Sequence, residues 1–161
     1  MIINESLIEL NRKIESKEKL IENLARKAGE AGCVRDVAGY MQSILEQEES
    51  FPSAIGYGIA IPHGKSKFVQ NPFLAFANSQ APFLWDKRTD QKVGLIFLIG
   101  VPKENATDTH LKILANICRG LRNQSHGERL VKATDVNQVM AVFEKWGLGA
   151  GNSILRPMGP S

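Results

Sequence analysis

Apolar residues recur every three or four positions in two stretches near the start of the chain, a spacing typical of amphipathic helices. Ser16 is placed to cap the first helix, of about sixteen residues, and Gly29 and Gly32 offer positions at which it can end. A second helix is expected to follow directly. The two apolar faces are formed by Leu20, Ile21, Leu24, Ala25 and Ala28 and by Val34, Val37, Tyr40, Met41, Ile44 and Leu45.

Shorter apolar runs in the middle of the chain predict strands. They cover residues 59–61, 73–77 and 93–100, and the last run is apolar on both faces, as expected of a central strand. The glycine- and proline-containing stretch 52–58 is expected to be turn and loop.

Helical spacing returns after the last apolar run. Residues 101–108 are expected to form a loop in which Thr107 or Asp108 caps a third helix. Two short amphipathic helices are expected from about residue 127 to residue 146. The apolar face of the third helix is formed by Leu111, Leu114, Ile117, Cys118 and Leu121. This succession predicts an α/β sandwich, with a sheet covered by helices.

Length and composition indicate a single domain and argue against several classes of protein, among them nucleic-acid-binding and membrane-spanning proteins. Its 161 residues suffice for one hydrophobic core, which we expect in residues 1–146, with residues 147–161 as a flexible tail rich in glycine and proline. The net charge of +3 is small and dispersed, so nucleic-acid binding is not expected. No apolar run is long enough to span a membrane, and no signal peptide is apparent. Cys33 and Cys118 are predicted to be free thiols in a reducing cytoplasm.

The three histidines differ in their surroundings. His126 lies in a polar segment and is interpreted as a solvated loop residue. Pro62 cannot sit inside a central ladder, so His63 is predicted to be the first residue beyond the strand that ends there. Gly64 then allows a sharp turn or the close approach of a ligand. A histidine that merely completes a loop hydrogen bond is the alternative interpretation.

The residues after His63 favour an anion. Lys65 and Lys67 add positive charge, Ser66 adds a hydroxyl, and the intervening backbone N–H groups could form an anion-binding concavity. His110 is expected in the first turn of the third helix, where a helix N-terminus also attracts anions. In isolation it is interpreted as a capping residue. If the two segments are adjacent, both histidines converge on one small anion.

Three chemistries are compatible with such a pair of histidines. A zinc site requires three or four ligands, and no HxH or HxxxH spacing supplies them. An acid–base pair acting on a phosphodiester is a second option. Nucleophilic attack by imidazole on phosphorus is the third, and it requires positioned donors and cations around the transferred group.

Three segments carry a resemblance to a known family. GYGIAIPHGKS (56–66) resembles the active-site signature of the fructose/mannitol-type enzyme IIA family of the bacterial sugar phosphotransferase system. SKEKLIENLARKAGEAGCV (16–34) is similar to the family's first helix. LIFLIGVPKENATDTHLKILANICRGL (95–121) is similar to its second conserved block, which holds another histidine. The resemblance extends over about residues 1–146, with the segments in the same order.

The resemblance implies a fold, an activity and partners. The fold would be a mixed sheet flanked by helices, and the chain would be a cytoplasmic phosphotransferase without metal or organic cofactor. It would accept a phosphoryl group from the phosphohistidine of HPr on His63, at Nε2 by analogy. It would pass the group to a cysteine of enzyme IIB, which serves the membrane enzyme IIC. His110 would support the phosphorylated ring, and Gly64, Lys65 and Ser66 would contact the phosphoryl group.

One position departs from the family pattern. Many members carry an Arg-Glu pair before the signature, and Gln47 stands where the arginine is expected. Glutamine can donate a hydrogen bond to the phosphoryl group but brings no charge. Lys65, Lys67 or Arg88 are candidates to supply the missing cation.

Other functions stay open at this point. The main alternative is a regulatory module of the nitrogen-related enzyme IIA type, which binds partners according to its phosphorylation state. A hydrolase and a purely structural domain are the others. Ile55 and Tyr57 are expected to be exposed for partner docking, whereas Phe83 and Trp85 are more typical of a core. The sequence determines neither which sugar is transported nor the oligomeric state, and a homo-oligomer is possible.

Overall fold

The computed structural model of the chain describes residues 3, 5–104 and 109–148. A six-stranded sheet runs through this part, in the order β1-β5-β6-β3-β2, and β4 also pairs with β6. β1, β3 and β4 pair in parallel with their neighbours, whereas β5 with β6 and β2 with β3 are antiparallel, so the sheet is mixed. The strands are β1 (Ile8–Arg12), β2 (Ala54–Gly56), β3 (Ile59–Ala60), β4 (His63–Ser66), β5 (Phe73–Leu84) and β6 (Lys92–Pro102).

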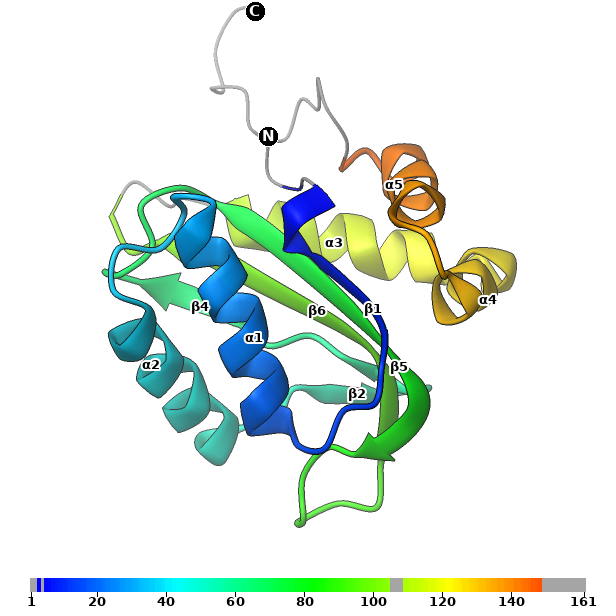
Figure 1. Ribbon diagram of the computed structural model, residues 1–161, viewed down its shortest axis with the longest axis horizontal. Helices are drawn as coiled ribbons and strands as arrows, with labels where there is room; N and C mark the ends of the chain where they lie inside the picture. Colours follow the sequence, from blue (N-terminus) through cyan, green and yellow to red (C-terminus); the bar gives the residue numbers. More distant parts are fainter. Residues whose placement is uncertain (1–2, 4, 105–108, 149–161) are drawn as a thin grey trace, which may run out of the picture.

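Helices cover both faces of this sheet (Figure 1). α1 and α2 pack on one face, and α3, α4 and α5 pack on the other. The predicted α/β sandwich is therefore confirmed. The helical elements are η1 (Glu5–Leu7), α1 (Lys17–Glu30), α2 (Val37–Ser50), α3 (Thr109–Leu121), α4 (Gln124–Lys132) and α5 (Val136–Lys145).

The first two helices begin at side-chain caps. The Ser16 hydroxyl accepts a hydrogen bond from the backbone N–H of Lys19 at 3.1 Å, as its position predicted, and the predicted apolar face of α1 is buried. Asp36 caps α2 through the N–H of Gly39. α2 therefore begins after Val34, which we expected inside the helix; Val34 instead forms an isolated β-bridge with Val69.

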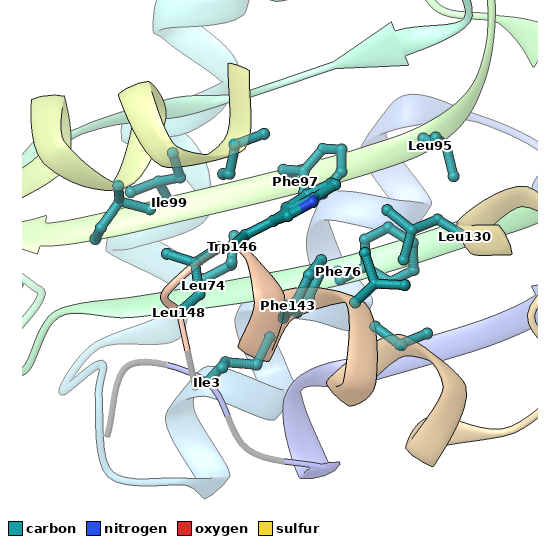
Figure 2. Packing of buried hydrophobic residues seen from close by; sticks show 14 of the residues in the cluster. Ile3, Leu74, Phe76, Leu95, Phe97, Ile99, Leu130, Phe143, Trp146 and Leu148 are labelled. Carbon is teal, nitrogen blue, oxygen red and sulfur yellow. The ribbon is translucent and has the colours of Figure 1, made fainter. Parts of the chain in front are cut away.

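The sheet separates two apolar clusters because successive side chains of a strand point to opposite faces. Phe76 and Phe97 face α3–α5, with ring centroids 5.2 Å apart. Figure 2 shows Trp146 lying against Phe97 and Phe143 in this cluster. The neighbouring positions, such as Ala75 and the residues on either side of Phe97, face α1 and α2.

Some strands were not predicted or were predicted too short. β1 was not predicted, and β2 lies in the stretch 52–58 that we expected to be loop. β5 continues well beyond residue 77, through polar residues. Asn78 is buried there because its amide donates to the carbonyl oxygens of Leu130 and Ala133 at 2.9 and 3.0 Å. Asn78 therefore does not end this strand, since the C-terminal end of α4 accepts the hydrogen bonds of its amide.

The later helices differ from expectation in two details. α3 buries Ile113 and Ile117, whereas Leu111 and Cys118, assigned to its apolar face, are exposed. His126 is not a solvated loop residue: it lies in α4, half-buried, and its Nδ1 accepts a hydrogen bond from the Trp146 indole at 2.9 Å. Of the expected tail, residues 147 and 148 are described, and the second is a buried leucine.

Candidate functional site

His63 lies directly after a short break in the sheet. β3 ends at Ala60, and the chain resumes pairing with β6 at His63, which lies opposite Ile99. Pro62, which has no N–H to donate, occupies the break. His63 therefore does lie beyond the end of β3, as predicted, but it begins a further strand, β4, where we expected a loop. Residues 64–66 continue this strand, so they do not form the predicted anion-binding turn.

The ring of His63 is oriented by a backbone carbonyl. Nδ1 lies 2.5 Å from the carbonyl oxygen of Ile61. Because a carbonyl oxygen only accepts, Nδ1 carries the proton, and the lone pair of the neutral ring is on Nε2. The side chain of His63 is exposed, and its Nε2 makes no hydrogen bond to the residues that the structure describes. The exposed nitrogen is therefore the one with nucleophilic character.

A surface cleft opens beside this ring. It has a volume of about 790 Å³ and lies between α2 and α3, next to residues 61–63. Phe51, at the C-terminal end of α2, is 84% exposed at the cleft. Sequence reasoning missed this residue, although an aromatic side chain that directly follows a polar helix end was a signal for it. The other lining residues include Gln47, Ile55, Ile61, Leu114 and Cys118.

Gln47 lies directly against the residue that follows His63. A Cβ atom added to Gly64 would lie 2.5 Å from Oε1 and 2.7 Å from Nε2 of Gln47. The amide therefore occupies the space that any other residue at position 64 would fill. The structure thus brings Gln47, Gly64 and His63 together, from α2 and β4.

The remaining residues expected around the phosphoryl group are placed differently. Lys65 is exposed and shares a face of β4 with His63, because the two are two positions apart. Ser66 points to the opposite face and is buried, and its hydroxyl accepts a hydrogen bond from the N–H of Phe68 at 3.1 Å. The ammonium of Lys67 lies over the Phe68 ring, 5.3 Å from its centroid.

Arg88 lies at a different site, in the β5–β6 connection. Its guanidinium binds both carboxylate oxygens of Asp86, at 2.9 and 2.8 Å, and the carbonyl oxygen of Glu48 at 2.8 Å. The hydrogen bonds that Asp86 accepts from the guanidinium and from the backbone N–H of Arg88 hold its pKa well below the usual range, and Lys17 adds to this effect. Arg88 is therefore engaged, and it does not line the cleft beside His63.

His110 lies in the first turn of α3, but its side chain is outside the described residues, as are Thr107 and Asp108. The strands that precede the two segments lie side by side, as their expected convergence requires, whereas the convergence of the two histidines stays a prediction. β4 pairs with β6 up to the contact of Ser66 with Pro102, and α3 begins seven positions after Pro102. In the sequence, α3 is thus the next element after β6, the strand that pairs with His63.

Among the described residues, no group of three His, Cys, Asp or Glu side chains is arranged to hold a metal ion. No helix in the described part is long and apolar enough to cross a membrane. Both cysteines are free thiols, as predicted, with Cys33 buried and Cys118 exposed. Ile55 and Tyr57 are exposed, as expected for docking residues, and Trp85 is buried.

A mixed sheet between two layers of helices, with an oriented and exposed imidazole at an edge cleft, defines an α/β domain with a histidine-centred surface site. The family model described as "Phosphoenolpyruvate-dependent sugar phosphotransferase system, EIIA 2" matches residues 1–146, and the chain belongs to this family.

Relatives within the family include both regulatory proteins and sugar-specific components. The chain is 35% identical to a nitrogen regulatory protein of Bradyrhizobium diazoefficiens, over 81% of this chain and 84% of the relative. It is also 35% identical to a fructose-specific EIIA component of Haloferax volcanii, over 85% and 88%. Among solved structures, the nitrogen regulatory protein IIA-Ntr of Neisseria meningitidis superposes with a TM-score of 0.76 at 28% identity, over 88% of this chain and 95% of that one.

Proposed function

We propose that the chain is a phosphotransferase component that carries a phosphoryl group on Nε2 of His63. It accepts the group from the phosphohistidine of HPr and passes it to the cysteine of a cognate enzyme IIB, during sugar uptake through enzyme IIC. The observation that carries this proposal is the 2.5 Å hydrogen bond between His63 Nδ1 and the Ile61 carbonyl, because it directs the Nε2 lone pair outward.

Both transfers are displacements at phosphorus. In the first, the Nε2 lone pair forms a new P–N bond while the P–N bond of the donor phosphohistidine breaks, and its electron pair stays on the donor ring. In the second, the cysteine thiolate forms a P–S bond, and the electron pair of the breaking P–N bond returns to Nε2 of His63. Neither step requires a metal or an organic cofactor, because the histidine is itself the nucleophile.

The neighbours of His63 have the chemistry that a phosphoryl group requires. Gly64 leaves room for the Gln47 amide, which can donate a hydrogen bond, and Lys65 supplies positive charge. We assign His110 a supporting role for the phosphorylated ring, since a helix N-terminus stabilises negative charge. Ser66 contributes indirectly, through the turn that follows β4.

Partners must bring their phosphorus atom to His63, so their docking surface surrounds the cleft. Phe51, Ile55 and Tyr57 are 84%, 52% and 100% exposed, and the first two line the cleft. Exposed apolar side chains around a polar centre suit a small, transient interface. We therefore assign these three residues to the docking of HPr and enzyme IIB.

A second candidate function is a regulatory module that binds partner proteins according to the phosphorylation state of His63. It is favoured by the equal identity, 35%, to a nitrogen regulatory protein and to a fructose-specific component. Such a module would take the phosphoryl group from HPr but would not transfer it to an enzyme IIB. Transfer to IIB therefore distinguishes the two.

The test is the intact mass of the protein after incubation with phosphoenolpyruvate, enzyme I and HPr. We expect wild type to gain one phosphoryl group that is acid-labile, and His63→Ala to gain none. Addition of an enzyme IIB should then remove the group from wild type. No gain in mass with active HPr would refute the phosphocarrier function, whereas a gain that IIB cannot remove would favour the regulatory module.

A further inference from the structure

Glu48 is a buried carboxylate at which four segments of the chain meet. Its side chain is 3% exposed. Oε2 accepts hydrogen bonds from the Trp85 indole at 2.9 Å and from the backbone N–H of Ser53 at 3.2 Å. It also lies 3.6 Å from the ammonium of Lys17. These contacts join α2 to the start of α1, to the segment after β5 and to the loop before β2. A buried charge requires such partners, so the carboxylate has a fixed position.

Hydrogen bonds of two intervening residues connect Glu48 to the ring of His63. Glu48 binds the N–H of Ser53, and the carbonyl oxygen of Ser53, in the next peptide group, accepts the N–H of Ile61 at 3.0 Å. The carbonyl oxygen of Ile61 is the acceptor for His63 Nδ1 at 2.5 Å. Each of these hydrogen bonds fixes the backbone position of the next residue, and the last residue, Ile61, presents its carbonyl to the imidazole. The carboxylate is thus separated from the imidazole by two residues of backbone.

Glu48 also fixes the end of α2 next to the site. Its carbonyl oxygen accepts a hydrogen bond from Arg88 at 2.8 Å, and the carbonyl of Glu49 is bound by the same guanidinium. With Glu48 directed into the interior, the preceding residue, Gln47, is directed toward Gly64. Both the ring and its neighbouring amide therefore depend on the same buried residue.

We propose that Glu48 is a positioning residue: by fixing the backbone of Ser53, and through it that of Ile61, it keeps the Ile61 carbonyl at Nδ1 and so holds His63 in the tautomer with the proton on Nδ1 and the lone pair on Nε2. The relevance of this role to phosphoryl transfer rests on the proposed function. The role itself concerns the unphosphorylated protein and can be tested without any partner.

The first test measures the tautomer directly. Two-bond proton–nitrogen correlations of the ¹⁵N-labelled imidazole of His63, recorded in alkaline buffer, report which nitrogen is protonated. In Glu48→Leu, which has a similar size but no acceptor, we expect a substantial population with the proton on Nε2. Glu48→Gln retains an oxygen that can accept from Trp85 and Ser53, so it should keep the wild-type tautomer. Glu49→Gln, at the exposed neighbouring carboxylate, is the matched control and should resemble wild type.

The second test separates positioning from general stability. In phosphoryl transfer from HPr, we expect Glu48→Leu to lower kcat on the order of tenfold to a hundredfold, with KM for phospho-HPr nearly unchanged. A folded Glu48→Leu protein with the wild-type tautomer would overturn the proposal, whatever its transfer rate. A Glu48→Gln protein as altered as Glu48→Leu would overturn it too.

A third variant covers the case in which Glu48→Leu does not fold. Trp85→Phe keeps the aromatic packing and removes one of the donors that hold the carboxylate, so a smaller shift in the same direction is expected. No shift in that variant would contradict the role of Glu48. Failure of wild type to accept a phosphoryl group would refute the proposed function but would leave the tautomer result intact, so the two failures are distinguishable.

Discussion

Gly64→Ala is the substitution that most directly tests whether Gln47 takes part in transfer. The new Cβ would lie 2.5 Å from Oε1 and 2.7 Å from Nε2 of Gln47, which is closer than nonbonded atoms approach. Gly64 is not among the residues with a positive φ, so alanine meets no backbone strain. The exposed amide of Gln47 must therefore move away, while the strand and His63 can stay in place.

The structure separates the effects on stability and on transfer. Replacing glycine by alanine in a strand contributes about 0.5–1 kcal/mol of stability, and displacing an exposed amide costs little, so the net change should stay within about 1 kcal/mol. A hydrogen bond to a charged group is worth about 1.5–3 kcal/mol. Losing the one from Gln47 to the phosphoryl group should therefore slow transfer about 10- to 150-fold.

A double-mutant cycle provides the assay. The rate of phosphoryl transfer from HPr is measured by rapid quench for wild type, Gly64→Ala, Gln47→Ala and the double variant, and urea unfolding is measured for each. We expect Gly64→Ala to have almost no further effect once Gln47 is alanine, because the displaced amide is then absent. Equal slowing by Gly64→Ala in both backgrounds would refute the reasoning, since the added methyl group would then act on His63 or on the partner instead.

Three further predictions follow from individual contacts. Gln47→Arg should raise the rate of transfer from HPr roughly tenfold in the same quench assay, because a guanidinium adds a positive charge and can bind two phosphoryl oxygens at once; a slower variant would contradict this. Hydrogen bonds from Arg88 lower the pKa of Asp86 in the folded state, so its stabilisation is present above the ordinary value of 3.8 and is lost as pH falls below it. When the free energy of unfolding is measured in urea between about pH 6 and about pH 3, wild type should therefore lose more stability than Asp86→Asn. Equal losses in the two proteins would exclude a contribution from the lowered pKa of Asp86. Gly100→Ala should lower the free energy of unfolding by about 1–3 kcal/mol, since its Cβ would lie 2.2 Å from a ring carbon of a buried phenylalanine, whereas Gly94→Ala on the same strand, with 3.7 Å to the nearest atom, should change it by less than about 1 kcal/mol.

The helices were predictable because their signals are local. Ser16 caps α1 through a residue only three positions away, and the buried face of α1 repeats within fourteen residues. The strands were less predictable where pairing alone creates them. β2 consists of three residues, Ala54–Gly56, that become a strand by pairing with β3. Their own sequence contains no pattern that favours a strand over a loop. Of the apolar face predicted for α3, Leu114, Ile117 and Leu121 do pack against the core. Leu111 and Cys118 face the surface although they are apolar, and the buried Ile113 was missed.

The candidate site was predictable in its residues but not in its arrangement. Proline, glycine and two lysines around His63 indicated an anion site, and the family resemblance pointed to Gln47. The contact of Gln47 with Gly64 joins residues seventeen positions apart, and it depends on how α2 packs against β4. His126 shows the same limit, since the indole that binds it comes from Trp146, twenty residues away.

The break at Pro62 shows why sequence and structure differ at the position that matters most. A proline predicts the end of a strand, and β3 does end before it. β6, however, is eleven residues long. It pairs with β3 near Leu95, and its backbone from Ile99 onward is available to pair with a further strand. The chain therefore rejoins the sheet at His63 after a gap of two residues. Within that gap the Ile61 carbonyl can accept from the imidazole, while the carbonyl of Pro62 accepts from β6. The motif contains the histidine, but the length and register of a strand more than thirty residues away place its ring beside the Ile61 carbonyl.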